Sequence, residues 1–203
     1  VANAAIDSGR FDVMMLAYHF GMWPNYQHIL ERAHAADIGV VAMKTLKGAR
    51  HAQFDELANA PASYPQAAFR WVLTNPAVSC LVVTIVDPAQ IDEYLFASGQ
   101  TPRTEDVALL ERYDTLVAGD YCQPHCGVCR SACPAGLPID DALRARMYEL
   151  DYGWHSESRR VFAPLQASFE VCRSCPAPCA SVCPQQIDIR ANLLQTTALL
   201  GRA

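Results

Sequence analysis

Short apolar runs alternate with amphipathic stretches along the first hundred residues. Three runs with almost no polar positions predict strands buried on both faces, at residues 11–18, 39–43 and 79–84. Apolar residues at helical spacing predict helices at residues 2–9, 25–36, 65–73 and 88–96. This alternation of strand and helix predicts a parallel sheet with right-handed crossovers.

The predicted sheet is incomplete as an independent domain. Three strand–helix units do not close a barrel of eight strands, and three buried strands leave an unpaired edge. We therefore expect further strands upstream of Val1. An amphipathic helix predicted at residues 104–118 leads into a cysteine-rich region, so we divide the chain into domains at 1–100 and 101–203.

Composition and charge exclude several classes of protein. The 203 residues are 51% hydrophobic and 18% charged, which is typical of folded domains, and the net charge of −5 offers no broad basic surface for nucleic acid. The apolar runs are shorter than the ~20 residues of a membrane span, and the first residues do not resemble a signal peptide. We therefore expect a cytoplasmic protein that binds neither nucleic acid nor membrane.

Eight of the nine cysteines form two groups of four. The groups are CQPHCGVCRSACP, with Cys122, Cys126, Cys129 and Cys133, and CRSCPAPCASVCP, with Cys172, Cys175, Cys179 and Cys183. A shift of 50 positions superimposes the first, third and fourth cysteines of the groups. The same shift superimposes the apolar positions after each Cys-Pro, such as Ile139 on Ile189. The match indicates an internal duplication with two equivalent sites.

The spacing of these cysteines favours iron–sulfur clusters over zinc. Zinc sites usually join two Cys-x2-Cys pairs across a longer loop, whereas the first group places four cysteines in 12 residues that end in Cys-Pro. In a protein with two [4Fe-4S] clusters, three close cysteines hold one cluster and the fourth ligates the other. The predicted ligand sets are therefore Cys122, Cys126, Cys129 with Cys183, and Cys172, Cys175, Cys179 with Cys133.

Each group departs once from the usual Cys-x2-Cys-x2-Cys-x3-Cys-Pro spacing, before Cys126 and after Cys175. An incomplete [3Fe-4S] site and structural zinc are therefore alternatives. Disulfides are disfavoured because the cytosol keeps thiols reduced. His125 lies beside Cys126 and could replace a ligand or tune the cluster.

The insert between the two groups carries aliphatic residues at helical spacing, at residues 139–150 and 161–169. We expect these residues, together with Trp154, to form the core that shields the clusters from water. The ninth cysteine, Cys80, lies in the apolar run SCLVVT and is expected to be a small buried side chain rather than a ligand.

Polar residues follow two of the predicted strands. Lys44 and Lys47 follow strand 39–43, and in a barrel that end of the strand carries the active site. A lysine there could meet a cofactor phosphate or a substrate anion, and the alternative is a solvated loop lysine. Tyr18 and His19 close strand 11–18 on the same side. His19 could act as an acid or base, but a histidine with satisfied hydrogen bonds is the favoured interpretation.

The segments FDVMMLAYHF, GVVAMKTLKG and YPQAAFRWVLTNPAVSCLVVTIVDPAQIDEYL resemble the last three strand–helix units of the aldo-keto reductase barrel. With the cysteine region, the chain resembles bacterial members that carry a ferredoxin-like tail. The resemblance implies an α/β fold, a partial TIM barrel of three units, followed by an α-helical ferredoxin-like domain with two [4Fe-4S] clusters.

The resemblance also implies an activity for the full-length protein. Aldo-keto reductases reduce a carbonyl with a nicotinamide cofactor, NAD(P)H, using a Tyr, Lys, His and Asp on the first four strands, so no catalytic residue lies in this chain and it is expected to be inactive alone as a reductase. Lys44, Gln90 and Glu93 are the implied cofactor-binding residues. The implied partners are a small carbonyl or redox substrate and an electron-transfer protein.

Three functional hypotheses follow. In the first, the barrel and the two clusters belong to one electron path of an oxidoreductase. In the second, the barrel segment is a non-catalytic scaffold for an electron-transfer module. In the third, the chain belongs to a reductase whose metal sites, iron–sulfur or zinc, are purely structural.

Overall fold

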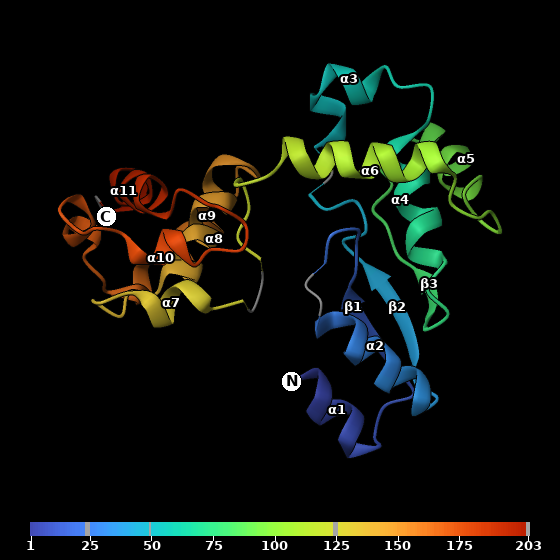
Figure 1. Cartoon of the computed structure of the whole chain (residues 1–203), viewed down its shortest axis with the longest axis horizontal. Coiled ribbons are helices and arrows are strands. Elements are labelled where there is room, and N and C mark those ends of the chain that lie inside the picture. The colour runs from blue at the N-terminus through green and yellow to red at the C-terminus, as the bar shows by residue number, and fades with distance from the viewer. Residues whose placement is uncertain (23–24, 49, 124–125, 202–203) are drawn as a thin grey trace. The chain divides into compact units, whose positions relative to one another are not determined.

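The structure, a computed structural model, describes residues 1–22, 25–48, 50–123 and 126–201, so the prediction for His125 lies outside the described residues (Figure 1). It is a mixed α/β protein, mostly helical, with one three-stranded parallel sheet. The chain forms two compact units, Val1–Leu116 and Val117–Ala203. Within the described residues, no helix has the length and apolar character needed to cross a membrane.

The parallel sheet is the centre of the first unit. Strands β1 (Val13–Ala17), β2 (Gly39–Met43) and β3 (Val78–Leu81) lie in the order β1-β2-β3, which confirms the predicted strand order and direction. Helices α2 (Asn25–Ala35) and α4 (Tyr64–Leu73) connect successive strands. Helix α1 (Ala2–Ser8) precedes them and ends at Gly9, whose φ of 59° is a conformation that glycine adopts readily. The described residues contain no closed barrel.

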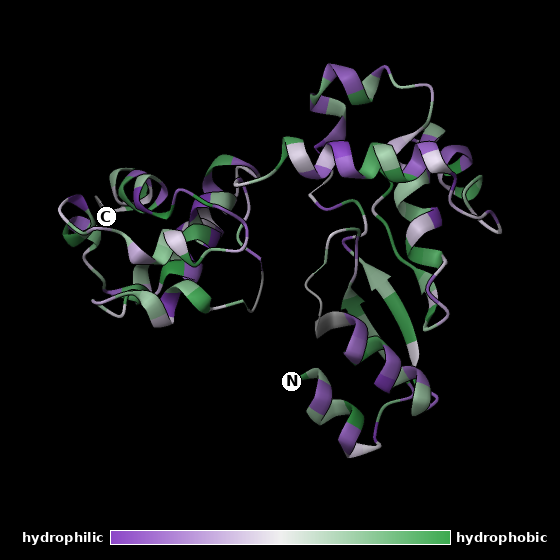
Figure 2. Cartoon of the chain, viewed as in Figure 1, coloured by the Kyte–Doolittle hydropathy of each residue, from purple (hydrophilic) through white to green (hydrophobic). Residues whose placement is uncertain are grey.

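Among the described residues of the first unit, helices cover one face of this sheet. Val40 of β2 is completely buried and packs in one core with Leu30 of α2 and Val72 of α4, and Figure 2 shows the apolar character of β2. On the opposite face, Val13 and Met15 of β1 are 58% and 57% exposed. The prediction that strand 11–18 is buried on both faces is therefore wrong, because alternate side chains point to a face that no described helix covers.

Cys80 lies on the same open face. The strand register aligns Met15 with Val41 and Val41 with Cys80 across the sheet. Cys80 is exposed, so the prediction of a buried side chain is wrong for the same reason as for Met15. An apolar sequence context shows that a residue belongs to a strand, but it does not show which face is covered.

Helix α6 (Thr104–Leu116) packs against α4 in the first unit. Arg70 donates hydrogen bonds to both carboxylate oxygens of Asp106, at 2.8 Å from Nε and 2.5 Å from Nη2. The two side chains are 2% and 0% exposed, so this ion pair is part of the core. The boundary between the units therefore falls after α6, whereas the division drawn from the sequence precedes this helix. The unit also contains a 3-10 helix (His51–Gln53), α3 (Asp55–Ala58) and α5 (Ala89–Leu95).

The described residues of the second unit are helices and loops. The elements are α7 (Val128–Ala132), α8 (Ile139–Leu150), α9 (His155–Phe162), two 3-10 helices (Ala163–Leu165 and Phe169–Arg173), α10 (Pro178–Ser181) and α11 (Ile189–Leu200). The bounds of α8 and α11 differ by the 50 positions found in the sequence, and α7 and α10 differ by the same shift at their N-terminal ends.

The turns between these helices repeat as well. The amide of Gly136 donates to the carbonyl of Cys133 at 3.0 Å, and the amide of Gln186 donates to the carbonyl of Cys183 at 3.1 Å. Gly136 and Gln186 share a left-handed backbone, with φ of 60° and 55°. The predicted duplication is therefore confirmed in the backbone and not only in the pattern of cysteines.

Candidate functional site

The cysteines of the second unit line two hollows. Cys183 joins Cys122, Cys126 and Cys129 around the first hollow, which encloses about 320 Å³ including its open mouth. The second hollow, about 440 Å³ on the same basis, has its own four cysteines: Cys133, Cys172, Cys175 and Cys179. The structure thus groups the eight cysteines in the two predicted sets, each with its fourth member from the other group. Their role as metal ligands stays a prediction.

The backbone explains why the fourth cysteine of each group leaves its own hollow. Cys129 lies within α7, whereas Cys133 follows the end of that helix with an extended backbone, φ −79° and ψ 117°. The bond from the Gly136 amide to the Cys133 carbonyl then turns the chain away. Because the second group repeats this geometry after α10, Cys183 departs from its group in the same way.

A residue with a left-handed backbone directly precedes each of the short helices α7 and α10. Gly127 precedes α7 with φ 65°, and Ala177 precedes α10 with φ 57°. A left-handed alanine costs about 1 kcal/mol, so its presence indicates that the surrounding structure imposes this loop. The two loops bring Cys126 and Cys175 to their hollows, although both cysteines have irregular spacing in the sequence.

Two thiols of the first hollow have a raised pKa. Burial is the largest cause and raises the pKa of Cys122 to about 12 and that of Cys129 to about 11. The further causes are negative charges on Asp140 and on the other cysteines of the same set. A positive centre would reverse this effect, because bound metal ions favour the thiolate form of their cysteine ligands.

The second hollow shows the same behaviour. Burial raises the pKa of Cys172 and of Cys179, and the charges of Cys133 and Cys175 raise both values further. Arg190 opposes this rise at Cys172. In each hollow, the cysteines that influence one another electrostatically are thus the members of one predicted ligand set.

The close grouping of ligands that a single metal ion needs is not found among the described residues. Within the part of the chain that the structure describes, no three His, Cys, Asp or Glu side chains gather closely enough to hold one metal ion. Which metal or cluster the eight cysteines bind stays a prediction.

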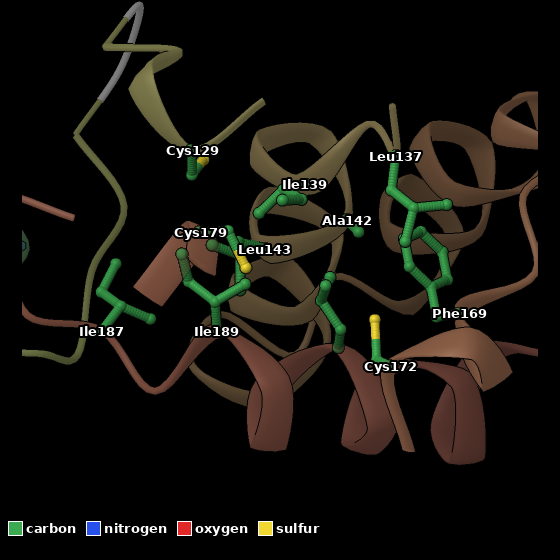
Figure 3. Close-up of a cluster of buried hydrophobic side chains, with 11 residues drawn as sticks. Cys129, Leu137, Ile139, Ala142, Leu143, Phe169, Cys172, Cys179, Ile187 and Ile189 are labelled. Atoms are coloured by element: carbon green, nitrogen blue, oxygen red, sulfur yellow. The ribbon is translucent and has the colours of Figure 1, made fainter. Parts of the chain in front are cut away.

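Aliphatic side chains separate the hollows from each other and from water. Ile189 at the start of α11 lines both hollows, and Leu143 and Leu193 line one each. Figure 3 shows Cys129, Cys172 and Cys179 within the same apolar cluster. The predicted burial of residues 139–150 and 161–169 is confirmed for Ile139, Leu143 and Phe169, whereas the shielding of clusters by these residues stays a prediction. The prediction of burial is wrong for Leu150 and Trp154, which are 43% and 56% exposed.

Leu150 and Trp154 lie near the end of α8, away from the cysteine cluster. The ring of Trp154 instead stacks on the ring of Tyr152, with 5.1 Å between the ring centroids. Both predictions failed because helical spacing identifies an apolar stripe but not how far the covering elements extend along it.

The predicted cofactor-binding residues of the first unit have ordinary structural contacts. Lys44 is exposed and has a left-handed backbone, with φ 57°. Gln90 accepts hydrogen bonds from the amides of Val86 at 2.8 Å and Asp87 at 3.2 Å. Glu93 accepts a hydrogen bond from the hydroxyl of Ser63 at 2.5 Å. No hydrogen bond or ion pair between described residues joins Lys44 to either of the other two, and their role in binding a nucleotide stays a prediction.

The remaining polar residues at the ends of β1 and β2 are also engaged. The Nδ1 atom of His19 lies 2.7 Å from the carbonyl oxygen of Phe20, which can only accept, so Nδ1 carries the proton. Burial lowers the pKa of His19. The hydroxyl of Tyr18 accepts from Asn75 at 3.0 Å, and Lys47 pairs with Asp114 at 2.7 Å. The interpretation of His19 as a histidine with satisfied hydrogen bonds is confirmed at Nδ1.

Arg190 is the residue of this site that the sequence interpretation missed. It lines the second hollow, and its Nη2 atom donates to the carbonyl oxygen of Cys175. The 50-position shift could have identified it, because that shift places Arg190 on Asp140.

Comparisons of the chain with protein-family models, with curated proteins and with solved structures found no match.

Proposed function

We propose that the second unit binds two [4Fe-4S] clusters and transfers single electrons as part of an oxidoreductase. One observation carries this proposal: two hollows, each lined by three cysteines of one group and the fourth of the other. This is the ligand arrangement of two-cluster electron carriers. When bound, such clusters accept and release one electron each.

The residues of the chain have three tasks in this function. The eight cysteines hold the clusters as thiolates. Ile189 and its aliphatic neighbours exclude water, which influences the reduction potential. The left-handed turns after Cys133 and Cys183 direct the fourth ligand of each group to the opposite hollow.

Anaerobic reconstitution of the whole chain with iron and sulfide tests the proposal. We expect about eight iron atoms per chain and a brown protein whose visible absorbance bleaches on reduction. Cys183→Ser should lower the iron content to about four, because it removes a ligand of only one set. Cys80→Ser is the matched control and should leave the iron content unchanged, because Cys80 lies in the other unit.

Two outcomes would contradict the proposal. A colourless protein with about two zinc ions would favour structural zinc sites. Equal iron content in the wild-type chain and in Cys183→Ser would show that this cysteine is not a ligand.

We further propose that the first unit contributes to an aldo-keto-reductase-like enzyme that uses NAD(P)H on a small carbonyl or redox substrate. This proposal rests on the sequence resemblance and on the three parallel strands in the expected order. The test is the binding of NADPH and NADH to this chain, measured for the wild type and for two variants. Lys44→Ala should weaken nucleotide binding, whereas His34→Ala, on the outside of α2, should not.

A further inference from the structure

The two hollows have equivalent ligands but opposite charges beside them. The 50-position repeat aligns the first turn of α8 with the first turn of α11. The second residue of α8 is Asp140, and the second residue of α11 is Arg190. The duplication therefore places a carboxylate at one site and a guanidinium at the corresponding position of the other.

Arg190 lies directly at the second hollow. It is one of the lining residues, and it donates to the carbonyl oxygen of Cys175 through Nη2. Its Nε atom is buried without a hydrogen-bond partner in the described structure. No ion pair between described residues involves Arg190.

A second contact adds to the effect of Arg190. The backbone amide of Ala177 donates to the sulfur of Cys175 at 3.4 Å. Hydrogen bonds to cysteine sulfur stabilise the more negative, reduced form of a cluster. Both contacts belong to the second hollow.

The first hollow lacks such a positive charge: none of its described lining residues is an arginine or lysine. Asp140 lies in the first turn of α8, the helix that carries Leu143 of that hollow. Arg130 pairs with Asp140 at 2.7 Å and with Asp141 at 2.8 Å, and Arg144 lies 3.6 Å from Asp141, so these two carboxylates and two guanidinium groups have no positive excess.

We propose that Arg190 and Asp140 give the two clusters unequal reduction potentials, so that the cluster held by Cys133, Cys172, Cys175 and Cys179 is the easier one to reduce. Reduction adds one negative charge, which a neighbouring guanidinium stabilises and a neighbouring carboxylate opposes. When the two clusters together hold one added electron, that electron would therefore reside mainly on the cluster of the second hollow. Its transfer between them oxidises one cluster and reduces the other, and no proton moves. This inference rests on the proposed function.

The test is a redox titration of the reconstituted whole chain, followed by electron paramagnetic resonance. We expect two separate midpoint potentials. Arg190→Gln should lower only the higher of the two midpoint potentials. Arg190→Lys keeps the positive charge, so it should retain most of the difference between the two midpoint potentials of the wild type. Asp140→Asn should raise only the lower midpoint and provides a second, independent variant.

A single midpoint shared by both clusters would overturn the inference, and so would a shift of the lower midpoint in Arg190→Gln. Iron content measured on the same samples separates this failure from failure of the proposed function. If the wild-type chain binds no clusters, the proposed function fails and the inference fails with it. If it binds two clusters of equal potential, only the inference fails.

Discussion

The two units of the chain differ in the kinds of side chain that their cores bury. The first unit buries aliphatic and aromatic side chains beneath a sheet and adds one buried ion pair. The second unit buries Cys129, Cys172 and Cys179 among aliphatic residues, beside hollows that its side chains do not fill. The first core is complete on its covered face, whereas the proposed function gives the second core two further groups to enclose.

Under the proposed function, removal of the clusters should have the largest effect, and it should change the stability of one unit only. Without iron, clusters would no longer join the two cysteine groups of the second unit, so we expect its helices to unfold locally while the first unit persists. Hydrogen exchange measured by segment would show full loss of protection in α8 and α11 and retained protection in β2 and α4. Equal protection of α8 with and without iron would contradict this comparison.

Arg70→Ala should destabilise the first unit by about 3–5 kcal/mol, because it leaves the Asp106 carboxylate buried without its partner. Urea unfolding of the whole chain, followed by hydrogen exchange in α4 and α6, measures the loss. Arg112→Ala is the matched control: Arg112 pairs with Glu56 on the surface, so its removal should change stability little. A comparable loss in both variants would mean that burial of the Arg70 pair is unimportant.

Substitutions in the sheet should distinguish its two faces. Val40→Ala removes a completely buried side chain and should cost about 2 kcal/mol. Val13→Ala changes a side chain that is 58% exposed and should stay within about 0.5 kcal/mol in the same urea experiment. A large loss at Val13 would show that another part of the protein or a partner covers the open face.

The smallest expected effect is a change of stability with pH in the first unit. Burial alone would raise the pKa of Asp106, but hydrogen bonds from Arg70 and from the Arg103 amide outweigh it and lower this pKa. The pair therefore stabilises the fold above the ordinary aspartate pKa of about 3.9, and this contribution is lost as pH falls through the lower folded-state value. The free energy of unfolding should decrease more steeply below about pH 4 in wild type than in Asp106→Asn. If the free energy of unfolding had the same pH dependence in the wild type and in Asp106→Asn, the stabilising role of the Asp106 carboxylate would be contradicted.

Sequence patterns predicted the order of strands and helices and the grouping of cysteines, because both depend on short-range spacing. The position of Cys183 beside Cys122 follows from the Cys-Pro turn and the repeat, so it too could be inferred. The exposure of Cys80 and of Trp154 could not, since it depends on which neighbouring elements cover a face. The position of Arg190 beside a hollow does not follow from the residues that the two copies of the repeat share, because Arg190 stands where the copies differ.

The exchange of the fourth cysteine between groups has a consequence for synthesis of the chain. Cys122, Cys126 and Cys129 leave the ribosome about fifty residues before Cys183, which at 5–20 residues per second is roughly 3–10 s. The second set is complete only when Cys179 has emerged, almost at the same moment. Neither proposed set of four ligands exists in a shorter nascent chain, so the proposed function requires both clusters to be inserted after nearly the whole protein has been made. A chain truncated before Cys179 would offer sulfur ligands but no finished site.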